Sequence, residues 1–168
     1  GSVPVEFNPS TQRVYVQVYD SNNNALFGTF ATVNGTNWTL DRSQAGNELA
    51  NVIVGNDGNN SLTGGAGDGT LVGGAGNDSL GGGEGNGVYG IDNAKDTVTE
   101  AAGQGTDVIQ SSVSYTAPAN VEYLTLTGTA AINATGNELA NVLQGNAGNN
   151  VLDGKAGDWF NAKLPAVG

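Results

Sequence analysis

The chain has 168 residues, and its 16 acidic and 5 basic side chains give a formal net charge of −11. It contains no cysteine and no histidine, which excludes disulfides, zinc–thiolate sites and nucleophilic pairs that need an imidazole base. The acidic balance argues against nucleic acid or an anionic membrane as partner and favours cations. No apolar run approaches the ~20 residues of a membrane span. We interpret Gly1-Ser2 as a cloning remnant and the chain as part of a longer protein.

The first 43 residues are poor in glycine and predict three strands. Valines alternate with tyrosine and glutamine over 14–19, the period of a half-buried strand. Residues 26–33 and 36–41 predict two more, joined by the hairpin signal Asn34-Gly35. The segment is similar to the last strands of a bacterial immunoglobulin-like domain, although it is too short for a whole sandwich. The alternative is a small antiparallel β-meander that caps one end of the glycine-rich region after it.

From Gly46 the chain divides into nine-residue repeats without a gap. They read GNELANVIV (46–54), GNDGNNSLT (55–63), GGAGDGTLV (64–72), GGAGNDSLG (73–81), GGEGNGVYG (82–90) and IDNAKDTVT (91–99). Their eighth position is always apolar: Ile53, Leu62, Leu71, Leu80, Tyr89 and Val98. A disordered glycine-rich linker has no reason for such a period, so the pattern favours a solenoid with an apolar ladder inside.

The nine-residue period lapses after 99 and returns at 136. Between them, 106–115 and 120–127 are rich in β-formers and predict irregular rungs of the same solenoid, with Pro118 in a connecting turn. The returning repeats occupy 136–162, and 13 of the 18 residues of 136–153 are identical to those 90 positions earlier. We therefore expect the parent protein to contain several such units in tandem.

These patterns predict an all-β fold, a parallel β-roll or β-solenoid of nonapeptide repeats with a small antiparallel β-meander at the N-terminus. The expected segments are a meander cap or partial immunoglobulin-like part (1–43), a β-roll (44–99), irregular solenoid rungs (100–135) and a second, degenerate repeat set (136–168).

The repeat at 73–81 fits the pattern G-G-x-G-x-D-x-U-x at every defined position, where U is apolar. Together with its neighbours in the same frame, it resembles the RTX (repeats-in-toxin) family over roughly 46–162. Six residues form a tight turn with carbonyls pointing inward, and the three residues x-U-x form a short strand. Two repeats complete one coil, so each turn stacks on the turn two repeats later. The resemblance implies that calcium, which takes six to eight oxygen ligands, is bound between stacked turns.

The resemblance implies two calcium sites made of position-six carboxylates and turn carbonyls. The first lies between turns 73–81 and 91–99, with ligands Gly74, Gly76, Asp78, Ile91, Asn93 and Asp96. The second lies between turns 55–63 and 73–81, with ligands Asn56, Gly58, Asn60, Gly73, Ala75 and Asp78. Asn60 supplies only a neutral oxygen, so we expect the second site to be weaker.

Elsewhere the repeats depart from the pattern at position six. Glycine stands there at 69 and 87, so no proper site is expected between 64–72 and 82–90. In the second repeat set position six is Asn141, Asn150 and Trp159, and residues 136–153 favour a metal-free solenoid with asparagine ladders. Asp57, Asp107 and Asp153 are interpreted as solvated turn residues.

The sequence predicts a binding or scaffolding module and not an enzyme, because every repeat aspartate has a turn or metal explanation. In one interpretation, tandem copies form a calcium-stabilised, surface-attached scaffold for adhesion. In another, the chain is a calcium-triggered folding and secretion appendage of an extracellular protease, lipase or polysaccharide-modifying enzyme. The expected partners are calcium, further copies of the chain and extracellular polysaccharide or a surface, without nucleic acid or membrane insertion. The family further implies type I secretion from a Gram-negative bacterium.

Overall fold

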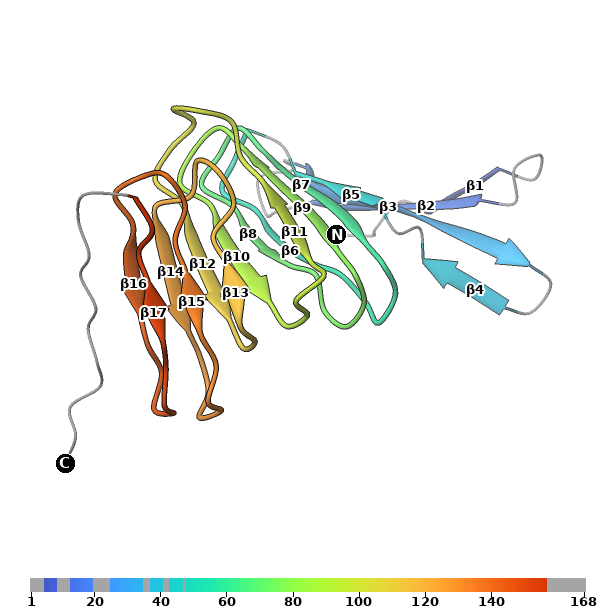
Figure 1. The fold of residues 1–168 in the computed structure, drawn as a ribbon. Helices are drawn as coiled ribbons and strands as arrows, with labels where there is room; N and C mark the ends of the chain where they lie inside the picture. Colours follow the sequence, from blue (N-terminus) through green and yellow to red (C-terminus); the bar gives the residue numbers. More distant parts are fainter. Residues whose placement is uncertain are drawn as a thin grey trace.

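The regular structure of this chain is built from short β-strands wound into a solenoid. The computed structural model describes the backbone of residues 5–8, 13–19, 25–34, 37–40, 43–46 and 48–156, and the side chains of 45–46 and 48–156. Every regular element in these ranges is a strand, and most of the strands stack in parallel (Figure 1). The predicted fold class, a parallel β-solenoid with an antiparallel meander at its N-terminal end, is confirmed.

The meander contains four strands, one more than the sequence predicted. They are β1 (Val5–Asn8), β2 (Arg13–Tyr19), β3 (Ala25–Asn34) and β4 (Asn37–Leu40). Strand β2 pairs antiparallel with β1 and β3, and β4 returns along β3 with Asn37 opposite Asn34. Gly35 of the expected hairpin turn lies outside the described residues. The likeness to an immunoglobulin-like domain stays a prediction.

A short strand that the sequence did not predict joins the meander to the solenoid. Strand β5 (Ser43–Ala45) contacts β3 where Ala45 lies opposite Gly28, and runs parallel to the solenoid strand β7 (Ser61–Gly65). Gln44 is the register partner of Leu62, an eighth-position residue. The three residues before Gly46 therefore add one strand to the first sheet of the solenoid.

The solenoid strands form three parallel sheets. The first continues from β5 and β7 through β9 (Ser79–Gly83) to β11 (Thr97–Thr99). The second contains β6 (Val52–Val54), β8 (Thr70–Val72), β10 (Val88–Ile91), β12 (Val108–Ser111), β14 (Tyr123–Leu126) and β16 (Val142–Gln144). The third contains β13 (Tyr115–Thr116), β15 (Ala134–Thr135) and β17 (Leu152–Asp153).

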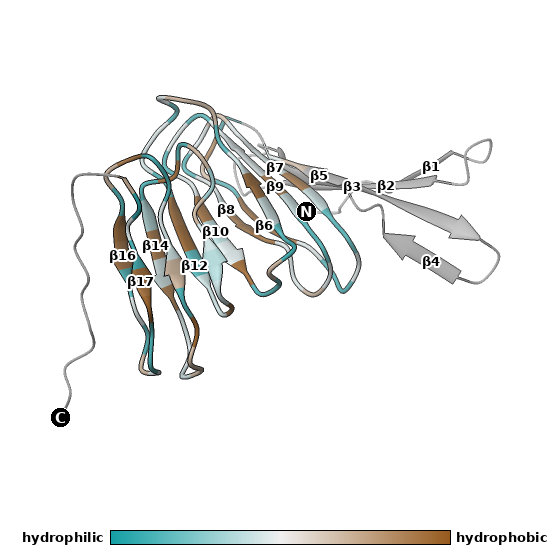
Figure 2. Ribbon diagram, in the orientation of Figure 1, coloured by the Kyte–Doolittle hydropathy of each residue, from teal (hydrophilic) through white to brown (hydrophobic). Residues whose placement is uncertain are grey.

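The core of the solenoid is a ladder of eighth-position side chains. Leu62 is the register partner of Leu80 in the first sheet, and Leu71 is the partner of Tyr89 in the second. All four are at most 1% exposed, whereas neighbours such as Ser79 are exposed. In Figure 2 brown bands accordingly cross the strands of the solenoid. Full burial of one such side chain contributes roughly 1.5–3 kcal/mol, so the predicted ladder is the main source of stability.

The irregular segment between the two repeat sets keeps the coil although it loses the nine-residue period. Val88 pairs with Val108, Val108 with Tyr123 and Tyr123 with Val142, so the strand spacing changes from 18 residues to 20, 15 and 19. Pro118 lies in the connection between β13 and β14. The segment therefore continues the second sheet without a break.

The 90-residue sequence duplication corresponds to a whole number of coils. The second sheet passes from β6 to β16 through β8, β10, β12 and β14, which makes five steps. The first residues of its two end strands, Val52 and Val142, are 90 positions apart. Because the duplicated sequences begin on the same sheet, one unit ends where an identical unit can begin.

Candidate metal centre

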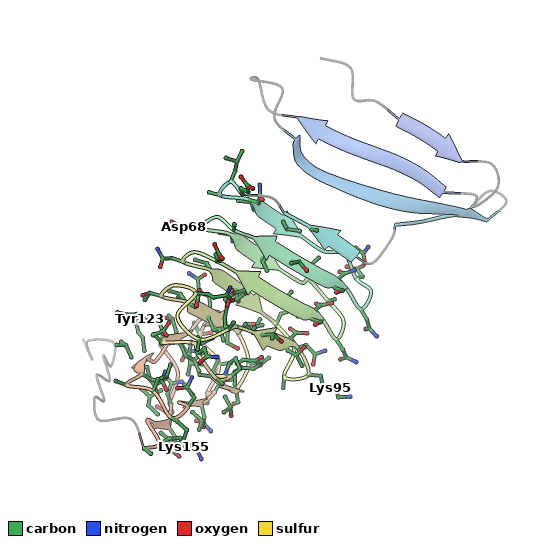
Figure 3. The ribbon with its side chains drawn as sticks, turned by 90° about the horizontal axis from the view of Figure 1, so that it is seen from above. Asp68, Lys95, Tyr123 and Lys155 are labelled. Carbon is green, nitrogen blue, oxygen red and sulfur yellow. The ribbon has the colours of Figure 1, made fainter. Side chains whose placement is uncertain are left out.

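The turns of the solenoid stack along two edges that carry different chemistry. Figure 3 shows Asp68 and Lys95 on opposite sides of the stacked coils, and we name the edges after them. The Lys95 edge contains the turns 55–60, 73–78 and 91–96, and the Asp68 edge contains 48–51, 64–69, 82–87 and 101–107. The two calcium sites predicted from the sequence both fall on the Lys95 edge.

Turns on the Lys95 edge stack closely because glycine allows it. Gly74 and Gly76 have φ angles of 84° and 137°, in the region that side chains with a Cβ disfavour. A Cβ on Gly74 would lie 2.9 Å from the carbonyl oxygen of Asn56, and one on Gly76 would lie 2.9 Å from that of Gly58. Residues 18 positions apart are thus in contact, and the predicted ligands of consecutive turns are brought together.

Two buried carboxylates follow each other along this edge. Asp78 is 2% exposed and Asp96 4%. The backbone N–H of Asn60 donates to Oδ1 of Asp78 at 2.8 Å, and the N–H of Asp78 donates to Oδ1 of Asp96 at 2.9 Å. Each position-six carboxylate therefore accepts from the residue one coil earlier, which fixes the register of the turns.

The second oxygens of these two carboxylates have different environments. Oδ2 of Asp96 accepts from the N–H of Asn93 at 3.1 Å, whereas Oδ2 of Asp78 is buried without a hydrogen-bond partner. It lies against Gly73, where a Cβ would overlap it. Burial, followed by repulsion from Asp96 and Asp92, raises the pKa of Asp78 above its usual value. A buried carboxylate oxygen without a donor is costly, so this position fits a bound cation.

The structure brings most of the first predicted ligand set together, but Ile91 differs. The Asn93 side chain lies across the carbonyl of Gly76 and donates its amide to it. Ile91 ends strand β10, and its carbonyl accepts from the N–H of Ser112 in the following coil at 2.9 Å. That carbonyl is the least available member of the set.

Among the described residues, no three acidic side chains are grouped so that they could hold a metal ion. Asp78 and Asp96 would therefore need carbonyl oxygens or water to complete a calcium shell.

In the second predicted ligand set, the side-chain oxygens of Asn56 and Asn60 accept hydrogen bonds within their own turn. Oδ1 of Asn60 accepts from the N–H of Asn56 at 2.7 Å, and Oδ1 of Asn56 accepts from the N–H of Gly58 at 2.8 Å. A Cβ on Gly55 would overlap the carbonyl oxygen of Gly73, and Ala75 is exposed at the turn. Only one carboxylate, that of Asp78, is present here. This supports the expectation of a weaker site.

In the second repeat set, asparagine amides bond to the oxygens that a cation would otherwise bind. The Nδ2 of Asn141 donates to the carbonyl of Val121 at 2.8 Å, and Nδ2 of Asn150 donates to the carbonyl of Ile132 at 2.5 Å. Both amides bond across coils to backbone carbonyls, and the amide of Asn150 also donates to Oδ1 of Asn146 in its own turn at 3.0 Å. These amides occupy carbonyl oxygens that a calcium ion would need, and the metal-free second set stays a prediction.

The Asp68 edge holds a buried acidic group that the sequence did not predict. Asp107, interpreted as a solvated turn residue, is 1% exposed, and Glu100 is 7% exposed. The hydroxyl of Tyr89 donates to Oε1 of Glu100, and the N–H of Asp107 donates to Oε2 of Glu122 at 2.8 Å. Burial, followed by repulsion from Asp107, raises the pKa of Glu100 to about 7. Burial also raises the pKa of Asp107, with a further contribution from Glu122.

A parallel solenoid with buried carboxylates stacked at one edge has the architecture of a cation-binding β-roll. The RTX calcium-binding nonapeptide repeat family (4 copies) matches residues 46–80, 54–89 and 135–158. The stretches 46–89 and 135–158 of the chain therefore match RTX calcium-binding repeats. It is similar to the endo-1,3-1,4-beta-glycanase ExsH of Rhizobium meliloti (strain 1021), with 40% identity over 65 residues that cover 39% of this chain and 14% of that enzyme.

No solved structure matches the chain. Within the described ranges, no helix is long and apolar enough to cross a membrane.

Proposed function

We propose that this chain is a calcium-stabilised β-roll module, a non-catalytic scaffold segment of a larger secreted or surface-attached repeat protein. The observation that carries the calcium part is the buried Oδ2 of Asp78, which has no hydrogen-bond partner and faces the bare Cα of Gly73. Without a cation, Asp78 and Asp96 repel each other inside a chain whose net charge is already −11. A bound calcium ion neutralises this repulsion and supplies the missing partner.

The residues placed to hold the ion are the carboxylates of Asp78 and Asp96 and the carbonyls of Gly74 and Gly76. Asn93 could contribute after its amide leaves Gly76. Calcium tolerates irregular shells of six to eight oxygens, so water can replace the carbonyl of Ile91. The function of the bound ion is structural: it ties consecutive coils together.

Isothermal titration with calcium tests this ligand set with three alanine variants. Asp78→Ala removes a carboxylate shared by both predicted sites and should lose more bound calcium than Asp96→Ala, which affects one. Asn150→Ala, in the metal-free second set, should bind as much calcium as the unchanged chain. Equal losses in all three variants would contradict the register, and undiminished binding by Asp78→Ala would contradict the site.

The scaffold part of the proposal is supported by the match between the 90-residue duplication and five coils. Units that end on the same sheet where they began can stack in tandem into a straight rod. Adhesion would then use repeated copies of one surface, with calcium, neighbouring copies and extracellular polysaccharide or a cell surface as partners. A rod of this kind requires no catalytic cleft, and the buried carboxylates are already engaged in turns.

Insertion of a second copy of residues 46–135 after Thr135 tests the tandem proposal. The insert adds five coils, and at a strand spacing of ~4.8 Å the molecule should lengthen by about 24 Å and keep its cooperative melting. The control is the same insert without its nonapeptide 64–72, which adds half a coil less and sends later strands to the wrong sheet. Small-angle X-ray scattering and thermal melting compare the two, and equal behaviour of both inserts would contradict the proposal.

A second candidate function is an appendage of an extracellular enzyme. The observation that favours it is the similarity to a segment of a glycanase, which places related repeats beside a polysaccharide-cleaving activity in one protein. The chain aligns with only 14% of that enzyme, so the similarity does not extend to most of it. A catalytic domain encoded beside this segment in the parent protein would favour the appendage, and further 90-residue units would favour the rod.

A further inference from the structure

Among the described residues, two buried side-chain oxygens have no hydrogen-bond partner: Oδ2 of Asp78 and Oε2 of Glu100. The first belongs to the calcium site described above. The second lies on the Asp68 edge, where the sequence predicted no site because position six is glycine at 69 and 87. A buried carboxylate oxygen without a hydrogen-bond partner therefore occurs at both edges of the solenoid.

Asp107 occupies the structural place of a position-six aspartate although it falls outside the nine-residue frame. The N–H of Gly87 donates to Oδ1 of Asp107 at 2.7 Å. This repeats the bond from Asn60 to Asp78 and the bond from Asp78 to Asp96, which measure 2.8 Å and 2.9 Å. The coil before Asp107 has 20 residues and not 18, so Asp107 comes two positions later than the repeat frame predicts. Its carboxylate still bonds to the turn one coil earlier.

Glu100 supplies the carboxylate that Gly87 lacks. On the Lys95 edge, the carboxylate of Asp78 lies against the position-one residue Gly73, where a Cβ would overlap it. On the Asp68 edge, the carboxylate of Glu100 lies in the same way against the position-one residue Gly82. The Tyr89 hydroxyl fills the space beside Gly87 and donates to Glu100. Two glycines thus make room for a carboxylate that arrives from a different part of the chain.

Among the described side chains, the negative charge at this place has no basic partner. The only basic residues with described side chains are Lys95, on the opposite edge, and Lys155, in the turn that follows β17. Glu100 and Asp107 repel each other, and Glu122 adds to the repulsion of both. The hydroxyl of Tyr89 donates to Glu100, which favours the ionised carboxylate. An arrangement of this kind fits a bound cation.

We propose that Glu100 and Asp107 form a second calcium site on the Asp68 edge, between the turn 82–87 and the turn 101–107. Tyr89 orients Glu100 through its hydroxyl, and Glu122 holds the backbone of Asp107. Since no three acidic side chains of the described residues group around one point, carbonyl oxygens and water complete the shell. This site shares no ligand with the Asp78–Asp96 site and does not depend on it.

The substitution Glu100→Gln tests the site because it keeps the shape and removes the charge. The matched control is Glu84→Gln, which removes an exposed charge from the same edge. At pH 8, above the pKa of about 7, Glu100 is ionised in the folded chain. The folded chain then holds a buried charge that the unfolded chain keeps in water, so this contribution destabilises the fold as the pH rises from 4.5 to about 7. In EGTA, Glu100→Gln should therefore melt higher than the unchanged chain.

Calcium binding distinguishes a cation site from a carboxyl that merely holds a proton. By isothermal titration, Glu100→Gln should lose one bound calcium and Glu84→Gln none. Asp78→Asn, which removes the carboxylate shared by both sites of the Lys95 edge, should retain the Glu100 site, and terbium bound there should luminesce through Tyr89. That signal should disappear in the double variant Asp78→Asn, Glu100→Gln. Full calcium stoichiometry in Glu100→Gln would overturn the second site and leave the first untouched. Retained terbium emission in the double variant would also overturn it.

Discussion

Leu71→Asp is expected to abolish folding even in millimolar calcium. Leu71 is 1% exposed and stacks between Ile53 and Tyr89 in the second sheet. The core is one side chain thick, so an aspartate there has no room to reach water and no partner for its charge. An uncompensated buried charge costs several kcal/mol, more than one modest calcium site contributes. Circular dichroism with and without calcium measures the loss of the β-sheet spectrum.

Ser79→Asp is the matched control because it adds the same charge to the same kind of strand. Ser79 is exposed, one residue before the buried Leu80, and its strand neighbours Ser61 and Thr97 are uncharged. A surface change of this kind is worth about ±0.5 kcal/mol, so the variant should fold normally. Equal folding of Leu71→Asp and Ser79→Asp would show that residues 64–90 do not form the alternating strands of a β-roll.

Withdrawal of calcium is expected to produce the second largest effect. Binding at a hundredfold excess over Kd contributes about 2.7 kcal/mol per site, which for a chain of this size corresponds to a Tm change on the order of 5–10 °C. EGTA should therefore lower the melting temperature by at least this amount and weaken the β-sheet spectrum. Magnesium at equal concentration is the control, because it demands octahedral geometry and gives up its water reluctantly.

A Tm and a spectrum that EGTA leaves unchanged would contradict the calcium proposal. The solenoid would then be held by its apolar ladder and asparagine amides alone.

Residue periodicity was sufficient to predict the coil and its core. Leu62, Leu71, Leu80 and Tyr89 recur every nine positions, and two repeats form one coil, so their stacking partners could be assigned in advance. The same frame paired Asp78 with Asp96, which the structure brings together through a backbone bond. Where the chain keeps its period, position in sequence determines position in space.

The features that sequence reasoning missed lie where the frame changes. Asp107 follows a coil of 20 residues and not 18, and it is buried. The nine-residue frame does not allow for two extra residues, so it could not place this carboxylate in a turn. The carboxylate of Glu100 fits between the stacked turns only because Gly82 and Gly87 have no side chains. In the sequence these two glycines indicate missing ligands and give no sign of a site. Strand β5 was missed because Gln44 replaces the apolar residue that marks position eight.

The spacing of the strand pairs also determines how far apart in sequence the contacts of this protein are. Pairs in the solenoid join residues 15 to 20 positions apart, even though every sheet there is parallel. In a chain of 168 residues this is a relative contact order of about 0.1, a value found in fast-folding helical proteins. Each new coil needs only the coil before it as a template. The chain can therefore order one coil at a time, and the folding time of a longer array grows with the number of coils and not with the distance between its ends.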